Sequence, residues 1–317
     1  MSFPAQKAAG EPCTHSRAYL FGLACVLTTV AIWSFVPIWA KLVLVALDPF
    51  TIASVRLSLA AMTVVLWQVV RGGQPRLWPG REWELYLSGL GLAGSYLLFT
   101  LGLDRTTASA SQVLIQVESL FLVLLGALVL RERVGVLKWL GSGVALAGVV
   151  VVAWDGRPWA EVFRSEAFGG NLLILLAAGC WSVYALGQKL AVGRGGVSEG
   201  LAPILIVATV VSAPFAIAAF HPTGPFTLRL GGYLVALSVL GTAGGYGFLA
   251  RGLQVLEAST VGMMIVMLPL GTIMAAHFCL GEVVTLWLGL GAVCIIGGIG
   301  LVLLSDRRRI LAATLLE

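Results

Sequence analysis

Ten runs of mostly apolar residues, each about 20 residues long, divide this chain and leave only short polar stretches between them. A helix of about 20 residues rises about 30 Å, the thickness of the hydrocarbon core of a bilayer. The runs cover residues 19–41, 50–70, 85–103, 108–130, 134–154, 171–191, 201–220, 230–249, 259–280 and 283–304. We therefore predict an all-α integral membrane protein with ten transmembrane helices.

The composition excludes a water-soluble fold. Hydrophobic residues make up 59% of the chain and charged residues 11%, whereas soluble domains are about half apolar and about a quarter charged. The net charge of +5 comes from basic residues in the loops, so it does not indicate binding to nucleic acid. The first apolar run is longer than the core of a signal peptide, and we expect it to be retained as a helix.

The positions of the basic residues predict the orientation. With the N-terminus in the cytoplasm, fourteen of the 20 Lys and Arg residues fall on the cytoplasmic side and five on the other, and Arg56 lies within a span. Cytoplasmic loops of membrane proteins carry the excess of Lys and Arg. We expect a multi-pass protein of the inner (plasma) membrane with both termini in the cytoplasm.

The chain also contains an internal duplication. Shifted by 150 residues, the segment 102–134 aligns with 252–284 without a gap, and a shift of 148 matches further positions. The matched pairs include Gly102/Gly252, Ser109/Ser259, Glu132/Glu282, Tyr96/Tyr246, Gly141/Gly291, Trp33/Trp181 and Lys41/Lys189. We predict a first five-helix repeat at 18–154, a connecting loop at 155–170 and a second repeat at 171–305. Because five is odd, the second repeat crosses the membrane inverted.

Inverted repeats are typical of secondary carriers, in which two halves rock about a shared site at the midplane. We therefore expect a transporter of a small solute that works by alternating access. A channel and a non-transport membrane scaffold are the alternatives. An enzyme is not expected, because Glu118 is the only acid deep within a span and no catalytic cluster can be assembled around it. An ATP-driven pump would need a Gly-rich phosphate loop, which the sequence lacks.

Two repeated motifs point to a known family. Each repeat opens with a Trp followed by a small residue (AIWSFVPIWAK, 31–41; GCWSVYALGQKLA, 179–191), and the second repeat contains LPLGTIMAAHFCLGE at 268–282. With Arg56 in the second helix, the chain resembles the ten-helix EamA-type transporters of the drug/metabolite transporter superfamily over residues 19–305. The first copy departs from the pattern, with Ser119 in place of Pro269. The resemblance implies export or exchange of amino acids, other small metabolites or drugs.

Glu118 and Arg56 are the ionisable residues deepest in the predicted spans. Such groups are costly in lipid and usually face the interior of a helix bundle. Glu118 is a candidate coupling group whose protonation could change during transport, with protons as the coupling ion. The alternative is a fixed ion pair with Arg56 that joins the second helix to the fourth. Gln112 and Gln116 fall on a different helical face from Glu118, so we do not expect both faces to line one cavity.

Aromatic, amide and sulfur-containing side chains complete the predicted cavity. The candidate lining residues are Trp33, Arg56, Tyr96, Gln112, Gln116, Glu118, Trp181, Tyr184, Gln188, Tyr246 and Met264. Helix bends are expected at Pro37 and Pro269. No cofactor and no metal are expected, because the five cysteines are scattered singly. The substrate, the direction of transport and the oligomeric state stay open.

Overall fold

The computed structural model describes residues 12–129, 135–192, 200–256 and 258–314. The first repeat forms α1 (Pro12–Val43), α2 (Pro49–Val70), α3 (Trp83–Arg105), α4 (Ala108–Ile115), α5 (Glu118–Val129) and α6 (Val136–Trp154). A short helix, α7 (Trp159–Val162), follows. The second repeat forms α8 (Glu166–Val192), α9 (Leu201–Ala219), α10 (Leu228–Val235), the π-helix η1 (Ala236–Gly244), α11 (Gly245–Leu253), α12 (Ala258–Ile265), α13 (Leu268–Leu280) and α14 (Leu286–Thr314).

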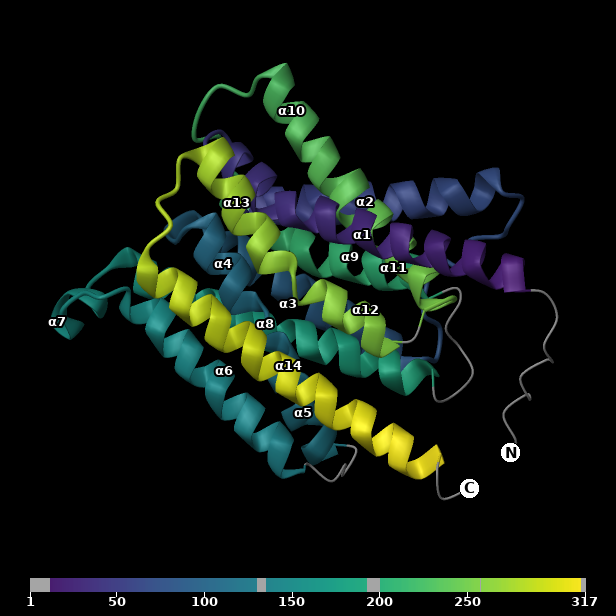
Figure 1. Cartoon of the computed structure of the whole chain (residues 1–317). Helices are drawn as coiled ribbons and strands as arrows, with labels where there is room; N and C mark the ends of the chain where they lie inside the picture. Colours follow the sequence, from purple (N-terminus) through teal and green to yellow (C-terminus); the bar gives the residue numbers. More distant parts are fainter. Residues whose placement is uncertain (1–11, 130–134, 193–199, 257, 315–317) are drawn as a thin grey trace.

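Nine stretches of helix in these ranges are long and apolar enough to cross a membrane, and they fall on nine of the ten predicted runs. The remaining run, 259–280, is also helical but is divided into α12 and the shorter apolar α13. The described chain contains one isolated β-bridge, between Leu47 and Pro222, and no strand. The prediction of an all-helical membrane fold built from two repeats is thus confirmed (Figure 1).

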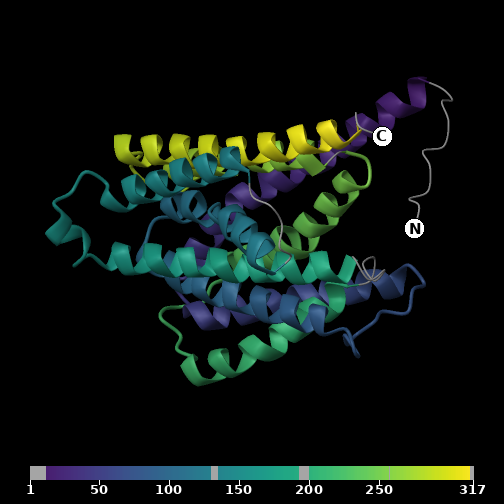
Figure 2. The same ribbon diagram turned by 90° about the horizontal axis from the view of Figure 1, so that it is seen from below.

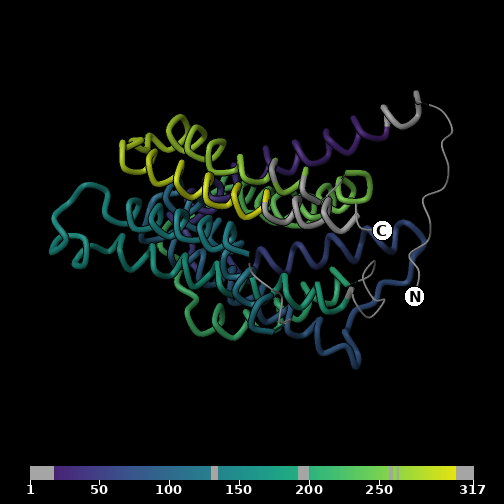
Figure 3. The backbone as a smooth tube through the Cα atoms, turned by 60° about the horizontal axis from the view of Figure 1, so that its bottom comes forward, coloured from purple at the N-terminus to yellow at the C-terminus, as the bar shows by residue number. Residues whose placement is uncertain are grey.

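The helices form layers. α6 and α14 pack together along one side of the bundle, and α2 and α9 lie on the opposite side (Figure 2). Between these sides, α1 contacts α11 and α13, and α8 contacts α3, α4 and α5. The start of α1 and the end of α14 point to one end of the bundle, and the connection that carries α7 lies at the other (Figures 1 and 3). We call the latter the α7 end.

Glycine contacts show that the two halves are inverted. In the α6–α14 contact, a Cβ on Gly141 would lie 2.5 Å from the Gly298 carbonyl oxygen, and one on Gly148 would lie 2.7 Å from that of Gly291. Residue numbers rise along one helix as they fall along the other, so the helices are antiparallel. Gly141 and Gly291 are duplicates, as are Gly148 and Gly298. The contact therefore maps onto itself when the repeats are exchanged, as a two-fold axis in the membrane plane requires.

A second pair of contacts obeys the same symmetry. In the α3–α8 contact, a Cβ on Gly102 would lie 2.8 Å from the Gly170 carbonyl oxygen. In the α1–α11 contact, a Cβ on Gly252 would lie 3.4 Å from the Gly22 carbonyl oxygen. Gly102 is the duplicate of Gly252, and a shift of 148 relates Gly22 to Gly170. Small residues at these points let the helix backbones approach closely.

The fourth transmembrane segment of each repeat is broken at equivalent points, between α4 and α5 and between α12 and α13. Pro269 lies in the first turn of α13, where its missing N–H costs no helical hydrogen bond. In the first repeat Ser119 takes that place, and its hydroxyl donates to the Gln116 carbonyl oxygen at 3.0 Å. A break without a proline was not expected from the sequence. Pro37, by contrast, lies inside the continuous helix α1.

Candidate functional site

A cavity lies between the two repeats. The first repeat contributes side chains from α1 to α5, and the second contributes them from α8, η1, α11, α12 and α13. Eight of the eleven residues predicted to line a cavity do so: Trp33, Arg56, Tyr96, Gln112, Gln116, Glu118, Trp181 and Tyr246. The cavity thus combines aromatic rings, amides, one basic side chain and one acidic side chain.

Three aromatic rings form one wall of the cavity. The Trp33 and Tyr246 rings meet edge to face, with centroids 5.6 Å apart, and Trp181 stacks on Tyr246 at 6.0 Å. Trp33 is fixed by a hydrogen bond of 2.9 Å from its Nε1 to the Gly241 carbonyl oxygen of η1. Trp33 and Trp181 are duplicate positions, so the two repeats offer equivalent indoles to the same space. Such a wall suits an apolar or aromatic group, or a cation held over a ring face.

Arg56 is the cation of the site. It is buried, its Nε donates to the Thr242 hydroxyl at 2.9 Å, and its guanidinium lies 4.2 Å from the centroid of the Tyr96 ring. The Thr242 hydroxyl in turn donates to the Leu237 carbonyl oxygen, five residues earlier in η1. A guanidinium has five N–H donors, and the hydrogen bond to Thr242 uses one of them. Arg56 therefore has donors left for a carboxylate or another oxygen ligand.

Glu118 is the acid of the site, and it does not pair with Arg56. The alternative of a fixed ion pair is wrong for these two described residues, since Arg56 bonds to Thr242 instead. The prediction that Glu118 and the Gln face of the fourth segment could not share a cavity is also wrong. The break after Ile115 starts a new helix at Glu118, so Gln112, Gln116 and Glu118 all face the same space.

Three of the predicted residues lie outside the cavity lining. Tyr184 and Gln188 lie behind Trp181: the Gln188 amide donates to the Tyr184 hydroxyl at 2.8 Å, and the Tyr184 ring lies 5.0 Å from that of Trp181. Met264 packs on an apolar cluster formed by Val26, Leu256 and Val261. The first two support the aromatic wall, whereas Met264 belongs to helix packing.

Sequence reasoning missed seven lining residues: Val36, Ser95, Phe99, Ile115, Gly241, Ile265 and Leu268. Most are apolar residues in apolar helices, and nothing in the sequence distinguishes them from residues that face lipid. Ser95 and Gly241 are small residues, and they contribute to the cavity by leaving space for it. The duplication gave one usable signal, because Ile115 and Ile265 are equivalent positions in the repeats.

The cavity is closed toward the α7 end by a packed layer. Its members come from α1, α3, α4 and α13, and each has at most 2% of its surface exposed: Ile38, Ala40, Leu103, Ala108, Thr272 and Ala276. A layer packed this tightly leaves no room for solute. The structure therefore represents a state in which the cavity is sealed from this end.

The fold and the cavity together define a multi-pass membrane transporter. The sequence profile of the EamA-like transporter family matches residues 20–154 and again 168–304. The chain belongs to this family, which confirms the resemblance seen in the repeated motifs.

Relatives from distant organisms share most of the chain. An uncharacterized transporter of Archaeoglobus fulgidus is 29% identical over 277 residues, which cover 86% of this chain and 93% of the relative. The uncharacterized inner membrane transporter YhbE of Escherichia coli K12 is 25% identical over 261 residues, which cover 80% and 79%. A solved crystal structure covers 92% of this chain and 99% of its own, with 19% identity and a TM-score of 0.62, so it has the same fold.

Proposed function

We propose that the protein is a secondary carrier that exports or exchanges small metabolites such as amino acids, by alternating access at the cavity between its two repeats. The observation that carries this proposal is that a guanidinium group (Arg56) and a carboxyl group (Glu118) both line the cavity beside an aromatic wall without pairing with each other. An amino acid presents a carboxylate, an ammonium group and a side chain. Arg56 suits the first and Glu118 the second, while the rings of Trp33, Trp181 and Tyr246 suit an apolar side chain.

The symmetry of the fold supports alternating access over a fixed pore. Exchange of the two repeats maps the α6–α14 contact onto itself and relates the α3–α8 contact to the α1–α11 contact. An inward-open and an outward-open state can then be near mirror images of similar energy, as a carrier requires. A channel in one chain has no need of such a relation.

We also propose that the carrier lies in the inner membrane with both termini in the cytoplasm, so that the α7 end faces outward. The basic residues of the loops support this orientation. A cysteine placed at Glu161 of α7 should then react with a membrane-impermeant maleimide added to intact cells. Labelling only after the membrane is broken would contradict the orientation.

A thermal-stabilisation screen of the purified protein over amino acids and other small metabolites tests the proposed solute. A bound solute raises the apparent stability by an amount that grows with the logarithm of its concentration relative to its Kd. The stabilising solute should lose its effect on Arg56→Gln and keep it on Arg229→Gln, which removes a cation outside the cavity. If no zwitterionic solute stabilises the wild-type protein, the amino-acid assignment fails.

A further inference from the structure

Glu282 holds the start of α4 from the opposite repeat. Its carboxylate accepts hydrogen bonds from the Ala108 N–H at 2.7 Å, the Ser109 N–H at 3.0 Å and the Ser109 hydroxyl at 2.6 Å. The first amides of a helix lack intrahelical partners and carry partial positive charge, so a carboxylate there is doubly favourable. Gly281 ends α13 in a left-handed conformation with φ of 68°, and the chain turns there to bring Glu282 to α4.

Lys41 holds the end of α3 in the complementary way. Its ammonium group donates to the Leu103 and Thr106 carbonyl oxygens, both at 2.6 Å, and to that of Asp104 at 3.4 Å. The last carbonyls of a helix carry partial negative charge, which a cation satisfies. Two residues therefore hold the chain where α3 passes into α4. Lys41 of α1 binds the carbonyl oxygens at the end of α3, and Glu282 of the α13–α14 connection binds the amides at the start of α4.

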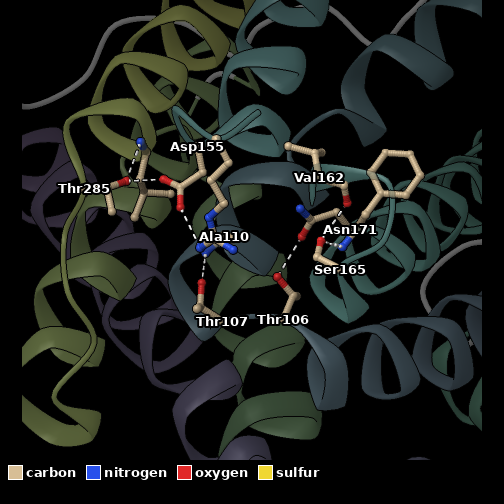
Figure 4. A network of polar contacts seen from close by, with 11 residues as sticks. Thr106, Thr107, Ala110, Asp155, Val162, Ser165, Asn171 and Thr285 are labelled. Atoms are coloured by element: carbon tan, nitrogen blue, oxygen red, sulfur yellow. Dashed lines mark hydrogen bonds and ion pairs between the residues drawn. The ribbon is translucent and has the colours of Figure 1, made fainter. Parts of the chain in front are cut away.

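The connection between α3 and α4 is also joined to α8 at the edge of a second, more polar hollow. There the Thr106 hydroxyl donates to the Asn171 side-chain oxygen at 2.7 Å (Figure 4). Thr107 and Ala110, at the start of α4, lie close by in the same view. Three parts of the bundle thus converge on the seven residues from Leu103 to Ser109.

These contacts lie directly over the cavity. Ala108 is four residues from Gln112, which is about 6 Å along a helix, and Gln112 lines the cavity. The packed layer that seals the cavity from the α7 end lies on the cavity side of these hydrogen bonds. Leu103 and Ala108 belong to this layer, and neither has any exposed surface. Moving α4 away from α13 would open this layer, and it would first break all three hydrogen bonds to Glu282.

We propose that Glu282 and Lys41 form the gate of the cavity at the α7 end, as positioning residues that hold α4 closed against α1 and α13. The inference rests on the proposed carrier function, because a gate of this kind has meaning only if the cavity opens to each face in turn. Release of the Glu282 carboxylate from Ala108 and Ser109 is the step that lets α4 swing. Rebinding restores the closed state without any ligand in the gate.

Accessibility of the cavity from each face tests the gate. Val36 lines the cavity, so a cysteine at this position, in a chain whose five native cysteines are replaced by Ala, reports on solvent entry. Membrane-impermeant maleimide is applied to reconstituted protein from each face in turn, and the α7 face is identified by labelling a cysteine at Glu161. Glu282→Gln should raise the labelling rate from the α7 face about tenfold, because it weakens charge-assisted hydrogen bonds.

Two further variants separate a gate from a general loss of packing. Ser109→Ala removes one of the three hydrogen bonds and should give a smaller increase from the α7 face. Glu161→Gln removes a carboxylate from the same end of the bundle without touching α4, and it should leave labelling unchanged. The gate is overturned if folded Glu282→Gln protein labels at the wild-type rate, or if its labelling rises equally from both faces.

The labelling needs no transported solute, so the gate and the proposed function fail separately. A shift in labelling without flux of any amino acid would count against the proposed solute and leave the gate standing. Amino-acid flux without a shift in labelling would support the carrier and exclude Glu282 as its gate.

Discussion

The Nε of Arg56 in α2 donates a hydrogen bond of 2.9 Å to the hydroxyl of Thr242, inside the π-helical stretch η1. The two residues come from opposite repeats and meet at the wall of the cavity. The wide turns of η1 let the Thr242 hydroxyl reach the Leu237 carbonyl oxygen five residues back. π-Helical segments occur often at functional sites, and here the segment both orients the guanidinium and receives the Trp33 indole.

Loss of the Thr242 hydroxyl should misplace Arg56. We expect Thr242→Val to weaken solute binding by about tenfold, because a hydrogen bond to a charged group contributes about 1.5–3 kcal/mol. Binding is measured by isothermal calorimetry with the stabilising solute. Thr209→Val in α9 is the matched control, since its hydroxyl bonds to the backbone of its own helix. Equal binding by both variants would contradict this role of Thr242.

The aromatic wall should contribute to affinity through both repeats. Trp33→Ala and Trp181→Ala are each expected to raise the KM for transport severalfold, because a cation or an apolar group over an indole gains about 0.5–2 kcal/mol. Initial rates in proteoliposomes give the KM. Trp139→Ala removes an exposed indole from the membrane-facing surface of α6 and should leave the KM unchanged. An equal change of the KM in Trp139→Ala would contradict the proposed contribution of the aromatic wall to solute affinity.

Glu118 lines the cavity without an ion pair to Arg56, which makes it the candidate for a coupling group. If it couples proton movement to transport, Glu118→Gln should abolish the dependence of flux on an imposed pH gradient. Flux is measured across a pH series. Transport that is unchanged at every pH would remove Glu118 from the coupling mechanism.

The contact between α6 and α14 should tolerate no added methyl group. Gly141→Ala places a Cβ against the Gly298 carbonyl oxygen, and overpacking of this kind costs about 1–3 kcal/mol. Gly143→Ala, in the same helix, meets nothing within 4 Å and should leave the protein as stable or slightly more so. Thermal unfolding in detergent compares the two. Equal midpoints would contradict the antiparallel glycine contact.

Much of the fold could be predicted because it follows from two regular features of the sequence, the long apolar runs and the internal duplication. Lipid requires long apolar helices, and the duplication of Gly141 and Gly148 at 291 and 298 already carries the symmetry of the α6–α14 contact. The breaks in the fourth segments were less visible. Pro269 signals one of them, whereas the equivalent position in the first repeat is Ser119, whose hydroxyl donates to the Gln116 carbonyl oxygen. Glu132, the duplicate of Glu282, lies outside the described residues.

The site could be predicted only where its residues are chemically unusual for a membrane. Arg56, Glu118 and the paired Trp33 and Trp181 stand out in any apolar helix, and the structure places all four at the cavity. Their partners do not stand out. The Thr242 hydroxyl accepts a hydrogen bond from Arg56, and the Gly241 carbonyl oxygen accepts one from Trp33, because both lie in η1, which departs from α-helical geometry. No periodicity in the sequence predicts a π-helix.

Counterflow in proteoliposomes tests the central claim most directly. Vesicles loaded with unlabelled solute are placed in a trace of the same solute in labelled form, and the internal label is followed with time. A carrier with one alternately exposed cavity should concentrate the label transiently, with saturation at high solute and loss of the overshoot in Arg56→Gln. Uptake that rises linearly with concentration and never overshoots would contradict a carrier and favour an open pore.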